Sequence, residues 1–278
     1  SDGLWLSNQR LEISIGRIPV GSEDEANKVV EKLMRYDSPK SFGKWRLGIT
    51  FLADDMDENW DSAHLFHSES LESTSQTNHP IYNPSKIYMD AYKEVLLGGA
   101  GSYPEASNEI DETMNKGTLV FNYIGHGGVA GMAKERVVTV DQIDGWENRY
   151  QMPVFVTATC ELTSYDNPKE KSAGEHMMLN AVGGPVALLT TTRIVYSGPN
   201  FSLNQGVWTN NILADNSFDR IGDIYMRTKN RPSINSNDRR FTLIGDPSMR
   251  LAKPKNRILI DTINGHDAAA LDTFEALS

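Results

Sequence analysis

The stretch Thr118 to Gly128 reads TLVFNYIGHGG, a run of mostly apolar residues followed by a histidine among glycines. A short apolar run bounded by turn residues is typical of a strand that is buried on both faces. Pro153 to Glu161 (PVFVTATCE) has the same form and contains the only cysteine of the chain, Cys160. Because the carboxyl ends of parallel strands meet at one edge of a sheet, His126 and Cys160 are predicted to line the same crevice.

Further strands are predicted on both sides of this pair. Arg46 to Ala53 (RLGITFLA) leads into Asp54 and Asp55, and Pro185 to Thr192 (PVALLTTT) follows a Gly-Gly pair. Leu11 to Val20 (LEISIGRIPV) alternates and contains β-branched residues, which predicts another strand.

Helices are predicted between the strands. Ser22 and Glu25 have the spacing of a capping box, and apolar residues then recur at helical spacing. This apolar face comprises Ala26, Val29, Val30, Leu33 and Met34. Other helices are expected at 87–97, from Pro104 to a stop at Gly117, and at 140–147, 172–182, 201–213 and 218–227, whereas the polar stretch to about Asn83 is expected to be loop-rich. The alternation predicts an α/β fold with a mostly parallel sheet and helices on both faces.

The composition indicates which class of molecule the protein binds. The net charge of −10 over 278 residues argues against nucleic acid, which is bound by surplus Lys and Arg, and favours a protein or peptide partner. No apolar run approaches the roughly 20 residues of a membrane helix. The sequence changes character after residue 252, with a strand-like RILID at Arg257 to Asp261. We therefore expect one main domain at 1–252, a linker or the start of a β domain at 253–278, and a longer parent polypeptide.

Three of the predicted strands are followed by a reactive residue type: an aspartate, His126 or Cys160. An imidazole beside a thiol can take its proton and later protonate a leaving amine, and a carboxylate, here Asp54 or Asp55, can orient the imidazole. The N–H groups of Gly127 and Cys160 are candidates for an oxyanion hole, because the glycines near His126 permit close approach and positive φ. Taken singly, each residue has a structural alternative, since a buried cysteine is often a small core residue. Their conjunction favours catalysis.

Metal binding is a weaker interpretation, and no cofactor is expected. His64 and His67 stand at i, i+3 without a nearby third nitrogen or sulfur ligand. An acidic segment offers oxygen ligands for calcium but lacks the glycine and terminal glutamate of an EF-hand. Its members are Asp54, Asp55, Asp57, Glu58 and Asp61.

At these residues the chain resembles the gingipain family of cysteine peptidases. The similarity rests on YIGHGG at 123–128, VTATCE at 156–161, ISIGRIPV at 13–20 and FTLIGDPSMRL at 241–251, and it covers about residues 11–252. It implies a caspase-like fold and a thioester mechanism, with Cys160 as nucleophile, His126 as base, and Asp54, or Asp55 after a shift of one, as third member. Tyr196 takes the place of an aromatic residue of the primary specificity pocket. The acidic residue that binds substrate arginine in some members has no clear counterpart.

The stretch GGPVALLTTTRIVYSGPNFSLN (Gly183 to Asn204) is most similar to the PorU-type sortases of the type IX secretion system. That resemblance implies a cell-surface, outer-membrane or extracellular peptidase that removes C-terminal sorting domains from secreted cargo. It also implies contacts with other secretion-system components and transfer of the cargo to anionic lipopolysaccharide. The alternative is a catalytically silent caspase-like scaffold that binds a secreted protein. A nucleotide-binding protein is disfavoured, because GxGxxG and GxxxxGK are both absent.

Overall fold

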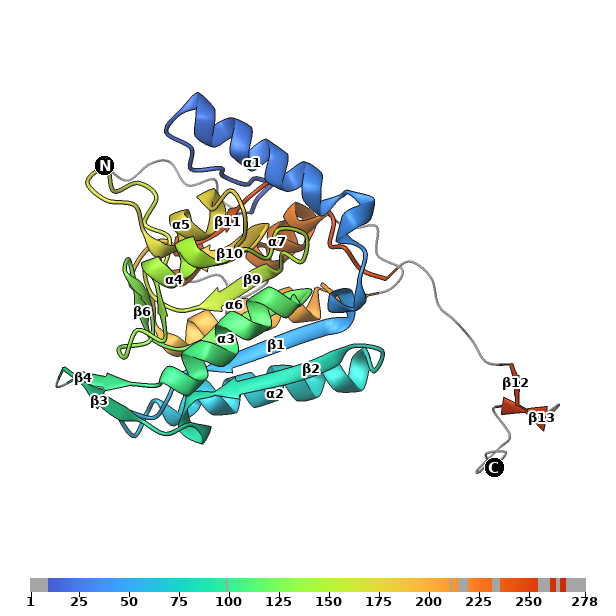
Figure 1. Cartoon of the computed structure of the whole chain (residues 1–278), viewed down its shortest axis with the longest axis horizontal. Coiled ribbons are helices and arrows are strands. Elements are labelled where there is room, and N and C mark those ends of the chain that lie inside the picture. Colours follow the sequence, from blue (N-terminus) through green and yellow to red (C-terminus); the bar gives the residue numbers. More distant parts are fainter. Residues whose placement is uncertain are drawn as a thin grey trace.

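The computed structural model describes residues 10–98, 100–210, 212–214, 220–231, 236–254, 261–263 and 266–268. Its centre is a six-stranded sheet in the order β11-β10-β9-β5-β1-β2 (Figure 1). The strands are β1 (Gly48–Ala53), β2 (Asn83–Tyr88), β5 (Val120–Ile124), β9 (Val154–Ala158), β10 (Ala187–Thr191) and β11 (Phe241–Ile244). Only β11 runs antiparallel to its neighbour in this sheet. The predicted α/β fold with a mostly parallel sheet is confirmed.

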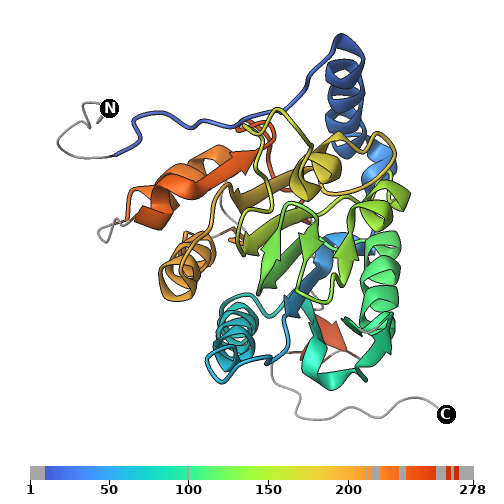
Figure 2. The same ribbon diagram turned by 90° about the vertical axis from the view of Figure 1, so that its left-hand side faces the viewer.

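Helices cover both faces of the sheet (Figure 2). On one face lie α2 (Ser62–Asn78), α6 (Ser197–Thr209) and α7 (Ile221–Lys229). On the other lie α1 (Glu23–Tyr36), α3 (Pro104–Lys116), α4 (Val140–Gly145) and α5 (Ala173–Leu179). Side chains alternate across each strand, so Val154 and Val156 join one buried cluster and Phe155 joins the other. Both faces of the central strands are therefore apolar, which explains their unbroken hydrophobic sequence.

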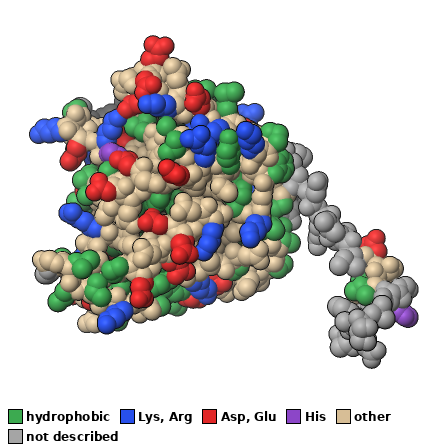
Figure 3. Space-filling view, viewed as in Figure 1, with side chains coloured by type: hydrophobic (Ala, Val, Ile, Leu, Met, Phe, Trp, Pro, Cys, Tyr) green, Lys and Arg blue, Asp and Glu red, His purple; other side chains and the backbone are tan. Residues whose placement is uncertain are grey.

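Short elements complete the fold. Three small sheets pair β3 (Val95–Leu97) with β4 (Ala100–Ser102), β6 (Gly127–Gly128) with β7 (Gly131–Met132) and β8 (Val138–Thr139), and β12 (Thr262–Ile263) with β13 (His266–Asp267). The 3₁₀ helices are η1 (Pro39–Ser41), η2 (Lys44–Leu47), η3 (Met89–Ala91) and η4 (Ser236–Arg240). Among the described residues, no helix has the length and apolar character needed to cross a membrane. On the face shown in Figure 3, acidic and basic side chains are interspersed.

Helix α1 begins as predicted but buries a different face. Ser22 caps it, and its hydroxyl accepts a hydrogen bond from the N–H of Glu25 at 3.2 Å. The predicted apolar face is only partly correct, because Val30 and Met34 are 52% and 69% exposed. Val29 is buried with Lys32 and Tyr36 instead. The apolar spacing failed here because a lysine occupies the centre of the buried face.

The ammonium of Lys32 caps the C-terminal end of α5. It donates to the carbonyls of Met177, Met178 and Asn180 at 2.9, 3.2 and 3.2 Å. Carbonyls at a helix C-terminus carry partial negative charge, so they can accept a cation without a carboxylate. Burial lowers the pKa of Lys32 to about 7. The lysine thus joins α1 to α5.

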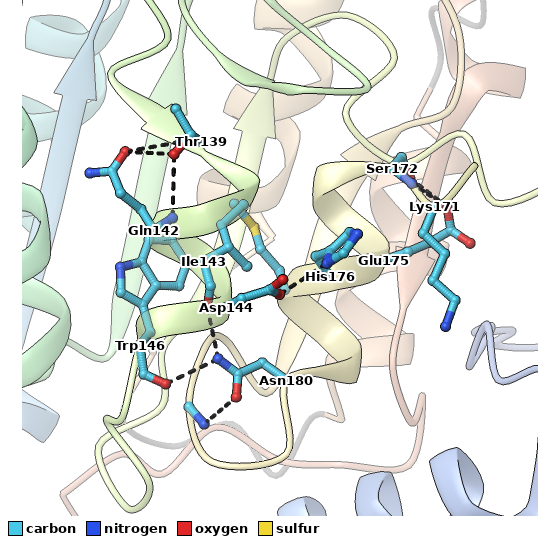
Figure 4. A network of polar contacts seen from close by, with 12 residues as sticks. Thr139, Gln142, Ile143, Asp144, Trp146, Lys171, Ser172, Glu175, His176 and Asn180 are labelled. Atoms are coloured by element: carbon cyan, nitrogen blue, oxygen red, sulfur yellow. Dashed lines mark hydrogen bonds and ion pairs between the residues drawn. The ribbon is translucent and has the colours of Figure 1, made fainter.

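A polar network fixes α4 against α5 (Figure 4). Thr139 and Gln142 form a capping box at the start of α4. The amide of Asn180 donates to the carbonyls of Ile143 and Trp146 at 2.7 and 3.0 Å. Because α4 precedes β9 and α5 follows the loop after Cys160, this network holds both flanks of the cysteine-bearing segment.

Three predicted elements were wrong. Leu11 to Val20 forms no strand and makes a single bridge, from Arg17 to Ile244 in β11. The stretch expected to be loop contains α2, which sequence periodicity missed because most of its buried side chains are polar: His64, Ser68, Leu71, Glu72 and Ser75. The helix expected at 87–97 is replaced by the end of β2, by η3 and by β3.

Other predictions were correct or untested. α3 ends at Gly117, whose φ of 83° is in the left-handed region that favours glycine. The strands expected after residues 118, 153 and 185, and the helices expected near 140, 172, 201 and 218, are present with shifts of a few residues. Of the strand predicted at Arg257 to Asp261, only Asp261 lies within the described residues.

Candidate active site

The register of three neighbouring strands places the predicted site residues at one edge. Ala53 of β1 pairs with Ile124 of β5, which pairs with Ala158 of β9. His126 and Cys160 each lie two residues beyond such a pair, so they stand at the same level of adjacent strands. The N–H of Asp54 donates to the Ile124 carbonyl at 3.1 Å, which continues the ladder past the end of β1.

Cys160 is half-buried, and its thiol lies against the main chain of Val195. Its Sγ is 3.5 Å from the Val195 nitrogen and 3.6 Å from the Val195 oxygen. Glu161 follows with a φ of 44°, a left-handed conformation that costs a non-glycine residue roughly 1–2 kcal/mol. The chain therefore turns sharply after β9 and leaves Cys160 at the turn.

The main chain of His126 is held on both sides. Its N–H donates to Asp54 Oδ2 at 2.7 Å. Its carbonyl accepts from the hydroxyl of Tyr123 at 2.5 Å and from the N–H of Ala133 at 2.9 Å. The backbone that carries the imidazole is thus fixed by three hydrogen bonds.

The imidazole itself faces Asp61. Nε2 of His126 is 3.2 Å from Asp61 Oδ1, and the Asp61 side chain is only 2% exposed against 36% for His126. The other carboxylate oxygen, Oδ2, accepts from the N–H of Glu58 at 3.1 Å, which fixes the orientation of the group. A buried and oriented carboxylate therefore contacts the ring nitrogen.

Asp54 and Asp55, the two candidates for the third catalytic residue, contact groups other than the His126 ring nitrogens in the hydrogen bonds that the structure shows. Asp54 contacts the main chain of His126, and Asp55 accepts a hydrogen bond from the Tyr103 hydroxyl at 2.8 Å. Burial raises the pKa of Asp54 to about 8, and the hydrogen bond from His126 opposes this shift. The assignment of Asp54 to the catalytic set stays a prediction, but the contact with the Nε2 atom comes from Asp61.

Sequence reasoning missed this role of Asp61 and considered it only as a calcium ligand. The reason is the undetected helix α2, for which Asp61 is the N-cap residue. An aspartate before a helix is a recognised start signal. Recognising the helix would have separated Asp61 from the acidic loop that precedes it.

His64 and His67 do not act as a pair. His64 is buried with its ring edge-on to His126, at 5.1 Å between centroids and 89° between planes. Burial lowers its pKa to about 4, so it is neutral at pH 7. His67 instead stacks on Phe201 at 3.8 Å. A ring nitrogen of His64, one of His126 and an oxygen of Asp54 lie within 4.8 Å of one another, as in a mixed metal site.

Close packing explains two of the glycines around His126. A Cβ on Gly125 would lie 2.4 Å from the Cβ of Asp54, and one on Gly127 would lie 2.4 Å from the hydroxyl of Thr159. Neither glycine has a positive φ, so the expectation of a special backbone conformation was wrong and that of close approach was right. Any side chain at these positions would collide with Asp54 or Thr159 unless the neighbouring segments moved apart.

The N–H of Gly127 is not used by the hairpin that contains it. Ala133 donates to the carbonyl of His126, and the next pair, Gly127 with Met132, is therefore the non-hydrogen-bonded one. The Gly127 N–H thus points away from β7, as an oxyanion-hole donor requires.

Exposed apolar side chains flank the site. Ile194 and Tyr196, on either side of Val195, are 64% and 72% exposed. Trp60, next to Asp61, is 72% exposed, and nearby Met56 is 54% exposed. Exposed apolar side chains therefore adjoin both Cys160's neighbour Val195 and the segment that carries Asp61, and Tyr196 comes directly after Val195.

Comparisons with known proteins agree with this arrangement. Residues 1–252 match the model of peptidase family C25. Among solved structures, the Arg-specific cysteine proteinase gingipain R (RgpB) matches with a TM-score of 0.67 and 18% identity, over 85% of this chain and 55% of that chain. The complex of Porphyromonas gingivalis RgpB pro- and mature domains matches with a TM-score of 0.70 and 16% identity, over 88% of this chain and 58% of that chain.

A structure described as a protease matches with a TM-score of 0.64 and 13% identity, over 90% of this chain and 59% of that chain. The chain thus spans little more than half the length of these solved structures. No curated protein matches. At such identities the solved structures establish a shared fold, and the family match, which covers most of the chain, establishes more: the chain belongs to peptidase family C25, a family of cysteine peptidases.

Proposed function

We propose that this chain is the catalytic domain of a cysteine endopeptidase in which Cys160 attacks the scissile carbonyl and His126 transfers the proton. The main support for the proposal is the register of β5 and β9, in which His126 and Cys160 lie at the same level of adjacent strands. The Asp61 carboxylate on His126 Nε2 supports it, because that contact leaves Nδ1 as the ring atom for proton exchange with the thiol.

The reaction proceeds in two steps. His126 takes the thiol proton, the thiolate adds to the carbonyl carbon, and the N–H groups of Gly127 and Cys160 stabilise the oxyanion. The imidazolium then protonates the leaving amine, and a thioester on Cys160 remains. Water or an amine adds to the thioester and restores the thiol. Asp61 keeps the imidazole oriented and stabilises its protonated form.

The third catalytic residue is tested by comparing Asp61→Asn with Asp54→Asn. We expect Asp61→Asn to lower kcat about 10- to 100-fold, because the ring loses its orienting charge. Asp54→Asn keeps an oxygen that can accept a hydrogen bond from the His126 N–H, so we expect it to lower kcat by a smaller factor. Steady-state kinetics on a peptide substrate measure both. A larger loss in Asp54→Asn would return the role to Asp54.

We further propose that the substrate is the C-terminal sorting region of secreted cargo, as in PorU-type sortases, and that the enzyme works at the cell surface. Support comes from the sequence stretch that resembles these sortases, Gly183 to Asn204. It forms β10, the Val195 segment against the thiol and the first part of α6. The exposed apolar side chains of Ile194 and Tyr196 favour an uncharged cleavage-site residue, and Asp166 is already paired with Arg193. Arginine specificity is therefore not proposed.

Transfer and hydrolysis are distinguished by the fate of the thioester. With a cargo-like peptide, a millimolar amine acceptor should divert product from free acid to amide while the rate of acylation changes little. Mass spectrometry across acceptor concentrations gives the partition, with Cys160→Ala as blank. If every acceptor yields only acid, the domain is an endopeptidase without transfer activity.

A separate experiment tests the silent-scaffold alternative. If a thiol-directed peptide electrophile reacts with Cys160 no faster than it reacts with free cysteine, that alternative is favoured.

A further inference from the structure

The connection between β10 and α6, residues 192–196, provides main-chain groups that contact the thiol. The N–H of Val195 donates to Sγ of Cys160 at 3.5 Å, and the Val195 carbonyl lies 3.6 Å from Sγ. A hydrogen bond to an ionised acceptor is stronger than one to a neutral acceptor, so this N–H favours the thiolate over the thiol. The thiolate is the reactive form of a cysteine.

The connection is also held by η4, through the side chain of Asn237. Its Nδ2 donates to the Tyr196 carbonyl at 2.9 Å, and its Oδ1 accepts from the Tyr196 N–H at 3.5 Å. A group that bonds both the N–H and the carbonyl of one residue acts as a neighbouring strand does in an antiparallel pair. Asn237 therefore fixes the residue that directly follows Val195.

Arg240, at the other end of η4, holds two further residues of the connection. Its carbonyl accepts from the Thr192 N–H at 2.8 Å, and its guanidinium donates to the Ile194 carbonyl. Together with Asn237, it bonds the main chain of every second residue from 192 to 196.

The two intervening residues contact the segment that carries the nucleophile. The Arg193 carbonyl accepts from the N–H of Glu161 at 3.3 Å, and Val195 contacts Cys160. Alternation of partners from one residue to the next is typical of an extended chain that lies between two others. The direction of the Val195 N–H therefore depends on how firmly η4 holds the residues on either side of it.

The position of η4 is in turn fixed by the core. Asn237 and Asp238 are buried, and Asp238 pairs with Arg231, which follows α7, at 2.6 Å. η4 also leads directly into β11, which pairs with β10. η4 is thus a rigid support for the connection.

We propose that Asn237 is a positioning residue of the peptidase. By holding Tyr196 it directs the Val195 N–H at Cys160 Sγ and so favours the thiolate. The inference rests on the proposed function, in which Cys160 is the nucleophile, and it assigns part of the activation of the thiol to a side chain that acts through two main-chain segments.

The test follows the alkylation of Cys160 by iodoacetamide as a function of pH, a reaction that requires no peptide turnover. Asn237→Ala should move the midpoint of the pH–rate profile up by about one pH unit, because the thiolate loses an aligned donor. On the acidic side of the midpoint, alkylation should therefore slow about tenfold, and above the midpoint the rates should converge. Arg240→Ala, a change at a partly exposed side chain, should shift the profile in the same direction by less.

Asn148 provides the matched control. It is also buried, and it makes the same pair of bonds to one residue: its Oδ1 accepts from the Gly184 N–H at 2.7 Å, and its Nδ2 donates to the Gly184 carbonyl at 3.2 Å. Gly184 precedes β10, whereas Tyr196 follows it, so this pairing lies at the opposite end of the strand. Asn148→Ala should lower the unfolding midpoint, as Asn237→Ala should, but leave the alkylation profile unchanged.

Three outcomes would overturn the proposal. One is a profile of Asn237→Ala that coincides with that of wild type, and another is an equal shift in Asn148→Ala, which would indicate a general loss of stability. If Asn237→Ala does not fold, an unchanged profile in Arg240→Ala contradicts the proposal instead. These results leave the proposed function intact, whereas alkylation of wild-type protein no faster than of free cysteine would overturn the proposed function and this inference with it.

Discussion

Replacing Cys160 by alanine is expected to lower peptide turnover by about five to six orders of magnitude, the loss seen when a covalent nucleophile is removed. The fold should survive, because Cys160 is half-buried and its polar contacts are long. Its Sγ lies 3.5 Å from the Val195 nitrogen and 3.6 Å from the Val195 oxygen, so little stability is lost with the thiol. Steady-state assays with a peptide substrate, beside a thermal unfolding curve, measure both quantities.

The single cysteine supplies a strict control for this experiment. A thiol-directed peptide electrophile should add once to each wild-type chain and not at all to Cys160→Ala, because the sequence contains no other thiol. Cys160→Ser keeps the volume and tests whether a weaker nucleophile supports turnover. Activity of Cys160→Ala within tenfold of wild type would rule out the proposed mechanism.

His126→Ala should cost several orders of magnitude in kcat near pH 7, since the base that activates the thiol and the acid that protonates the amine are lost together. Alkylation of Cys160 by a small electrophile should slow as well, because the thiolate loses its proton acceptor. Raising the pH should recover part of the alkylation rate in the variant, as hydroxide replaces the imidazole as base.

A second histidine provides the matched comparison. His176 lies in α5 and pairs with Asp144 at 2.9 Å, and it has no part in the proposed mechanism. His176→Ala should leave both kcat and alkylation near wild-type values. Equal alkylation rates in His126→Ala and wild type would show that His126 does not activate the thiol.

The central part of this site could be predicted from sequence because it depends on local patterns. Buried strands have continuous apolar sequences, and a reactive residue directly after such a strand must leave the core at the sheet edge. The glycine before His126 was informative for a related reason, since the packing of Gly125 against Asp54 excludes a side chain. These signals are contained within stretches of about ten residues.

The carboxylate partner of the imidazole was not predictable in the same way. Asp61 reaches His126 because α2 starts there, and α2 lacks an apolar stripe since it buries His64 and Glu72. Likewise Lys32 is buried because carbonyls of α5 surround it, a partner that is distant in sequence. Tertiary contacts override periodicity wherever polar groups find buried partners.

The bridge at Arg17 links the beginning of the described chain to its last core strand. The N–H of Arg17 donates to the Leu243 carbonyl at 2.9 Å, and its carbonyl accepts from Gly245 at 2.8 Å. All catalytic candidates precede residue 200 in the sequence, yet this closure cannot form until residue 245 has been synthesised. At roughly 5–20 residues per second, the N-terminal segment waits about 10–50 s on the ribosome for its partner. Synthesis of the site residues therefore precedes closure of the domain that supports them.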